Sequence, residues 1–287
     1  MAVFERNYKR WEGTPTPRST RFLILPRYLL RDVFKSRLLT FFYAACFLFP
    51  VGCLGYIYLI NSSQFLQIFP DFVVDQIFKV DSAFMARFVH VQCSLAFFLA
   101  LFIGPGLISR DLANNGLPLY LSRPFSRTEY VVGKLTVLAV MLSTITWMAA
   151  GLVIAAQTGF QGAAWLSANL GLLFGIFAVS WVWILVLCLL ALSVSAWVRW
   201  KPIAGFVMLF FLLGGKFFGL LTNFLFKTEL GSLFDLGHLM AVLRASWIGA
   251  EAPSEISPAT AVIALSCFLA FFLFLLNRKI RAYEVVG

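Results

Sequence analysis

The chain has 287 residues, of which 61% are hydrophobic and only 13% are charged. A soluble domain has about a quarter of its residues charged, so this composition excludes an ordinary soluble protein. The formal net charge is +10, and in a membrane protein an excess of Lys and Arg usually reflects topology and contact with anionic lipid. We therefore expect contacts with membrane lipids and no nucleic-acid partner.

Residues 1–37 are predicted to form a cytoplasmic arm followed by an interfacial helix. Between residues 21 and 37, apolar residues alternate with basic ones. The basic residues of this segment include Arg27, Arg31, Lys35 and Arg37. The pattern predicts a helix in the membrane interface with its basic side toward the headgroups. A straight cytoplasmic extension of the first span is the alternative.

Six apolar segments follow, each close to the length of about 20 residues that a helix needs to cross a bilayer. They cover residues 38–60, 89–108, 135–156, 168–197, 203–226 and 259–276. The sequence therefore predicts an all-α integral membrane protein in which residues 38–276 form a six-span domain. Residues 277–287 would be a cytoplasmic tail.

The first two spans contain helix-breaking residues. These are Pro50 in the first span and Gly104-Pro105-Gly106 at one end of the second. Proline removes a backbone donor and clashes with the preceding turn, so we expect a kink or break at each site. Each kink is either a hinge for alternating access or a passive feature of the fold.

The connection between the second and third spans, residues 109–134, is polar and patterned. Ser126 and Glu129 have the spacing of a capping box, which predicts that a helix begins two residues after Pro124. A helix, a proline break and a new helix would present a compact elbow to a cytoplasmic partner. An ordinary charged loop is the alternative.

The sequence of residues 107–134, LISRDLANNGLPLYLSRPFSRTEYVVGK, resembles the cytoplasmic signature of the type-2 ABC transporter permease family. The match consists of an acidic residue after the second span, a proline after a basic residue, and a closing Gly-Lys pair. These are Asp111, Pro124, Gly133 and Lys134. The six-span layout agrees as well, so the resemblance covers nearly the whole chain.

The resemblance implies two kinds of protein partner. One is a separate ABC ATPase subunit, which binds ATP and magnesium, and the other is a second permease copy or a homologous permease. It also implies that the interfacial helix and the connection transmit ATP-driven closure. The coupling residues would be Arg110, Asp111, Leu117, Arg123, Pro124, Gly133 and Lys134.

The chain itself is predicted to be a transport subunit rather than an enzyme, with no cofactor or metal of its own. No segment matches the phosphate-binding pattern GxxxxGK[ST]. The nearest string, Gly214-Gly215-Lys216-Phe217, lacks both the spacing and the hydroxyl residue. His90 and His238 lack the carboxylate or thiolate partners that a metal site needs.

The distribution of basic residues predicts the orientation. Of the 23 Lys and Arg residues, 18 lie in residues 1–37, 109–134, 198–202 and 277–287, and four lie in the opposite connections. The 13 acidic residues divide almost evenly. The positive-inside rule therefore predicts a multi-pass protein of the cytoplasmic (inner) membrane with both termini in the cytoplasm.

Lys216 is the one basic residue inside a predicted span. Either it reaches the headgroups or sits at a local helix break at Gly214-Gly215, or it contributes to a transport path or a dimer contact. The following connection, residues 227–258, has apolar residues at near-helical spacing over residues 230–247. This spacing predicts short outer helices between spans five and six.

The function predicted from these features is the permease subunit of an ABC-type exporter. Two alternatives remain open. An ion-coupled secondary carrier usually places carboxylates near the midplane of the membrane, where this sequence has none. A non-transporting membrane scaffold of a multi-protein machine would share the same fold and basic face.

Overall fold

The computed structural model describes residues 24–62, 79–114 and 126–280. The secondary structure of these residues is helical, without strands, so the all-α prediction is confirmed for this part of the chain. Six helical stretches are long and apolar enough to cross a membrane. They are Arg37–Ile60, Ser82–Ala113, Arg127–Gln161, Leu170–Trp197, Lys201–Phe226 and Pro258–Lys279.

Two spans begin well before their apolar stretches because polar residues cap them. The carboxylate of Asp81 accepts a 2.8 Å hydrogen bond from the backbone N–H of Phe84 at the start of α6 (Ser82–Ile103). At the start of α9 (Arg127–Ser143), Ser126 and Glu129 form the predicted capping box, with bonds of 3.1 and 2.6 Å. Such caps satisfy backbone donors that have no partner within the helix.

Three spans are interrupted. The first divides into α2 (Arg37–Ala45) and α3 (Leu48–Ile60). Pro50 lies in the first turn of α3, where a backbone N–H would have no partner within the helix in any case. The second divides at Gly104 into α6 and α7 (Pro105–Ala113), which confirms the break predicted there. The third contains a π-helical turn, η2 (Thr144–Met148), before α10 (Ala149–Gln161), which the sequence pattern did not predict.

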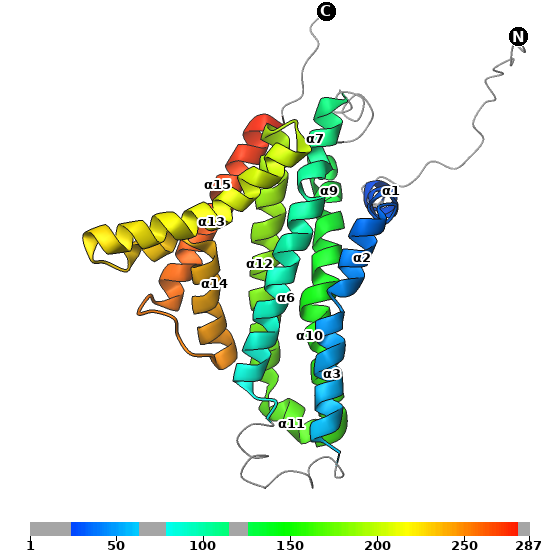
Figure 1. Cartoon of the computed structure of the whole chain (residues 1–287), viewed down its shortest axis with the longest axis vertical. Helices are drawn as coiled ribbons and strands as arrows, with labels where there is room; N and C mark the ends of the chain where they lie inside the picture. Colours follow the sequence, from blue (N-terminus) through cyan, green and yellow to red (C-terminus); the bar gives the residue numbers. More distant parts are fainter. Residues whose placement is uncertain (1–23, 63–78, 115–125, 281–287) are drawn as a thin grey trace, which may run out of the picture.

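Helix α12 (Leu170–Trp197) is the centre of the bundle. It contacts α6, α7, α9, α13 (Lys201–Phe226) and α15 (Pro258–Lys279), and it is apolar on all sides, as expected of a helix surrounded by others. Figure 1 shows α2, α3 and α10 on one side of it, while α13 diverges on the other. We call the end of the bundle with α1 and α7 the α7 end, and the opposite end, with α11 (Ala163–Ala168), the α11 end.

Helix α1 (Ile24–Val33) is separate from the first span. Figure 1 shows it end-on beside the upright α2, so its axis crosses that of the span. Leu25 and Pro26 are buried, whereas Arg27 and Arg31 are exposed. A straight extension of the first span is therefore wrong, and the amphipathic helix predicted from the sequence is present.

The connection between α13 and α15 forms the predicted short helices η3 (Leu230–Phe234), α14 (Leu236–Arg244) and η4 (Ala245–Gly249). Helix α13 runs unbroken through Gly214 and Gly215, so the helix break considered at that point is wrong. Gly215 and Gly219 instead admit η3, because a Cβ at either position would overlap the carbonyl oxygen of Phe234 or Gly231.

Gly104 is a position where we expect substitution to weaken the fold. A Cβ at Gly104 would lie 2.5 Å from the Cβ of Ala191 and 2.7 Å from the carbonyl oxygen of Ala100. Overpacking of this kind destabilises by about 1–3 kcal/mol. We expect Gly104→Ala to lower the thermal unfolding midpoint of the protein in detergent.

Gly52→Ala is the matched control, because no atom lies within 4 Å of the Cβ it would add. We expect Gly52→Ala to leave the midpoint unchanged or to raise it, since alanine favours helix over glycine. Equal midpoints for Gly104→Ala and the wild-type protein would contradict the close approach of α6 and α12.

Candidate functional site

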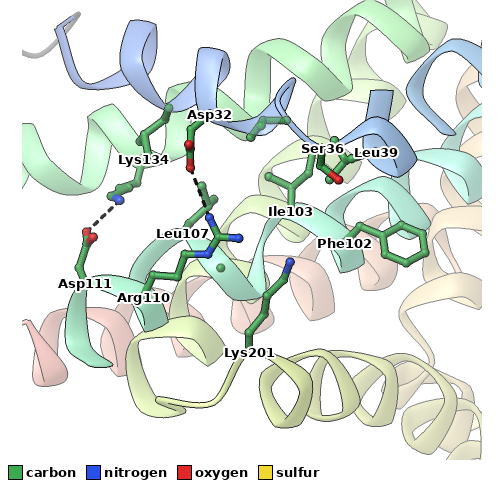
Figure 2. Close-up of a pocket in the computed structure, with 13 residues that line it drawn as sticks. Asp32, Ser36, Leu39, Phe102, Ile103, Leu107, Arg110, Asp111, Lys134 and Lys201 are labelled. Carbon is green, nitrogen blue, oxygen red and sulfur yellow. Dashed lines mark hydrogen bonds and ion pairs between the residues drawn. The ribbon is translucent and has the colours of Figure 1, made fainter. Parts of the chain in front are cut away.

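Charged side chains from four helices gather at the α7 end. They line a pocket of about 200 Å³, shown in Figure 2. The charged residues are Asp32 of α1, Arg110 and Asp111 of α7, Lys134 of α9 and Lys201 of α13. Residues that are far apart in the sequence thus form one cluster.

Asp111 and Lys134 form a buried ion pair between α7 and α9. The Lys134 Nζ lies 2.9 Å from Asp111 Oδ2, and the two side chains are 2% and 18% exposed. The hydroxyl of the buried Tyr130 donates a 2.6 Å hydrogen bond to the same carboxylate, and the Lys134 Nζ lies 5.5 Å from the centroid of the Tyr130 ring. Removing one partner of a buried pair leaves the other charge uncompensated, so the pair holds α7 and α9 together.

A second set of ion pairs joins α7 to α1 and is exposed. Arg110 Nη1 lies 3.3 Å from Asp32 Oδ2, and Lys35 Nζ lies 3.0 Å from Asp32 Oδ1. All three side chains are about half exposed or more. Exposed pairs contribute at most about 1 kcal/mol each, so this link is much weaker than the link between α7 and α9.

Helix α7 is also fixed to α12 by Ser195. The backbone N–H groups of Ile108 and Ser109 each donate a 2.9 Å hydrogen bond to Ser195 Oγ, which donates in turn to the carbonyl oxygen of Pro105 at 2.8 Å. Ser195 is buried. The break at Gly104 is therefore held in a defined geometry against the central helix.

The structure brings together three of the seven predicted coupling residues: Arg110, Asp111 and Lys134. Gly133 is buried in α9 next to Lys134. Three others lie outside the described residues: Leu117, Arg123 and Pro124.

The predicted basic residues near α1 are all exposed. Lys35 pairs with Asp32, and no ion pair to a described residue is present for Arg27, Arg31 or Arg37. Lys216 lines a different pocket, between α6, α13 and α14, and takes no part in this site.

Four residues of the site were not predicted: Asp32, Tyr130, Ser195 and Lys201. Tyr130 precedes Lys134 by four residues, so helical spacing already placed the two on one face of α9. The other three come from distant helices, and no local pattern in the sequence connects them to residues 109–134.

Exchanging Asp111 for asparagine tests the buried pair. Loss of one partner from such a pair typically lowers the free energy of unfolding by about 3–5 kcal/mol. We expect a decrease near this range because the charged Lys134 remains buried. The measurement is the unfolding midpoint in detergent for Asp111→Asn and for the double variant Asp111→Asn/Lys134→Met, which should recover part of the loss.

The exposed carboxylate of Asp32 supplies the control. Asp32→Asn removes the same charge from exposed pairs, so we expect the free energy of unfolding to fall by less than about 1 kcal/mol. Equal decreases in the unfolding midpoint for Asp111→Asn and Asp32→Asn would contradict a stronger link between α7 and α9 than between α7 and α1.

Comparison with known proteins identifies the family of the chain. The sequence matches the model of a family described as "ABC-2 family transporter protein" over residues 30–275. No curated protein matches the chain. The matched range includes the end of α1, the charged residues at the α7 end and nearly all of the six spans. The chain therefore belongs to the ABC-2 transporter family and is the membrane-spanning permease of an ABC transporter.

Proposed function

We propose that this permease exports its substrate by coupling its own spans to ATP hydrolysis in a separate ABC ATPase subunit. ATP and magnesium bind in that partner. The observation that carries the proposal is the buried pair of Asp111 and Lys134, 2.9 Å apart. It joins the two helices that flank the connection predicted to contact the ATPase.

The pair gives the permease a mechanical path from that connection to its centre. Because Asp111 and Lys134 hold α7 and α9 together, the partner's closure displaces both helices as one unit. Ser195 then passes the displacement of α7 to α12 through its three buried hydrogen bonds. By the family resemblance, Leu117, Arg123 and Pro124 are the residues that meet the ATPase.

Helix α1 has a different role in this proposal. It packs along α9 and is joined to α7 by the exposed pair of Asp32 and Arg110, so in this proposal it follows α9 more closely than α7 during the cycle. The exposed Arg27, Arg31, Lys35 and Arg37 then attract anionic headgroups, at about 1 kcal/mol for each basic residue near the surface. Helix α1 thereby lies in the interface of the cytoplasmic leaflet.

A second permease copy, or a homologous permease, completes the transporter. Helix α13 diverges from the bundle in Figure 1 and exposes large aromatic side chains along its length. They include Phe206, Phe210, Phe217 and Phe224. This apolar surface is available for the second subunit within the membrane.

The proposed orientation is testable by cysteine labelling. In a background without the five native cysteines, Thr128→Cys places a thiol near the start of α9 and Glu251→Cys places one after η4, both at exposed positions. We expect an impermeant maleimide to label Glu251→Cys in intact cells and Thr128→Cys only after permeabilisation. The reverse pattern would overturn the orientation.

ATPase capture tests the coupling. We expect a tagged candidate ATPase subunit, co-expressed with the permease and purified in nanodiscs, to retain the wild-type chain and to lose it on Leu117→Asp or Arg123→Ala. Lys79→Ala is the control, because Lys79 is exposed and lies just before the start of α6, whose other end adjoins α7. Unfolding midpoints equal to that of the wild type show that the variants are folded.

Two results would count against the proposal. Folded wild-type permease that retains no ATPase subunit would overturn the coupling. A captured and active ATPase without ATP-dependent efflux from vesicles would favour the non-transporting scaffold.

A further inference from the structure

A second pocket, larger than the one at the α7 end, lies between α6, α13 and α14. Its volume is about 620 Å³. Lys216 on its wall lies about 22 Å along α13 from Lys201, at 1.5 Å per residue, so the two pockets are separate sites on this helix.

Basic groups from three helices line this pocket. They are His90 of α6, Lys216 of α13, and His238 and Arg244 of α14. One carboxylate also lines it, that of Asp235, whose Oδ1 accepts hydrogen bonds from the backbone N–H groups of Gly237 and His238 at 2.8 and 3.2 Å. Asp235 is thus the cap of α14.

The two cations of the pocket have no protein counter-ion in the described part of the chain. The ion pairs among the described residues include neither Lys216 nor Arg244. His238 does have a partner, because its Nε2 lies 2.8 Å from Ser254 Oγ. Lys216 is exposed and Arg244 is half-buried, and cations without a counter-ion beside apolar side chains are favoured by an anionic ligand.

The remainder of the lining is mainly apolar. Phe97 and Trp183 form the wall toward α6 and α12, and Leu209, Leu212 and Met240 form the wall toward α13 and α14. A small hydrophilic anion would leave these walls uncovered, and an uncharged lipid would leave Lys216 and Arg244 unpaired. An anionic head attached to acyl chains satisfies both parts of the lining.

We propose that this pocket binds the phosphate or carboxylate head of an anionic acyl-chain amphiphile, which the transporter moves across the membrane. The Arg244 guanidinium offers a planar pair of donors, and Lys216 adds a compact positive charge. The acyl chains lie along the apolar wall. Binding is independent of the proposed export function, whereas the role of the amphiphile as substrate rests on it.

Fluorescence quenching tests the binding. Trp183 lines the pocket, so brominated acyl chains seated there should quench it, and the difference between wild type and Trp183→Phe isolates its signal from the other tryptophans. We expect brominated phosphatidylglycerol to quench Trp183 at concentrations about tenfold lower than phosphatidylcholine with the same chains, as a charge-assisted contact implies.

Charge variants locate the headgroup. We expect Arg244→Gln and Lys216→Gln each to weaken quenching by phosphatidylglycerol about tenfold, and Arg244→Lys to retain part of the affinity. Arg87→Gln is the matched control, since Arg87 is exposed on α6 and lies outside the pocket lining. Unfolding midpoints of all variants are compared with the wild type, so that loss of binding is separated from loss of fold.

Equal quenching by the two lipids, or quenching unaffected by both charge variants, would overturn the proposal. Competition by inorganic phosphate at millimolar concentration would also overturn it, because the site would then take a soluble anion. The substrate role fails if a coupled, ATP-hydrolysing complex does not move headgroup-labelled phosphatidylglycerol between leaflets. Failure to capture an ATPase would instead concern the export function and leave the quenching result intact.

Discussion

The fold depends on a constraint that burial imposes: a backbone group freed at a buried helix break finds no water to bond and must find a partner within the protein. At Gly104 the second span breaks, and Ser195 of the central helix bonds the N–H groups of Ile108 and Ser109 and the carbonyl oxygen of Pro105. The break is thereby turned into a contact between α7 and α12. The close approach of Gly104 to Ala191 makes this contact sterically feasible.

The ion pairs around α7 differ in strength because they differ in exposure. Lys134 is 2% exposed and its pair with Asp111 is enclosed by Tyr130, whereas the Asp32–Arg110 pair is open to solvent. Helix α7 therefore has firm connections to α9 and to α12, and a weaker, exposed connection to α1.

The two pockets hold cations that form no ion pair with a described residue, in different surroundings. At the α7 end, Lys201 lies beside carboxylates that are already paired with Arg110 and Lys134. In the pocket between α6, α13 and α14, Lys216 and Arg244 lie among apolar side chains. Two glycines of α13 let η3 approach closely and so set where α14 begins. Of the short helices between the last two spans, α14 therefore forms part of the wall of the second pocket.

The sequence alone determined the class of the protein, its six spans, the amphipathic α1 and the start of α9, because apolar run length and capping residues act locally. It also pointed to Asp111 and Lys134 through the family pattern. Only the tertiary structure paired them with each other, joined Asp32 to Arg110 and placed Ser195 against α7, because these contacts come from helices far apart in the sequence. Lys216 shows the same limit: the sequence placed it inside a span, but only the packing of α13 against α6 and α14 shows that it lines one pocket with Arg244 and His90.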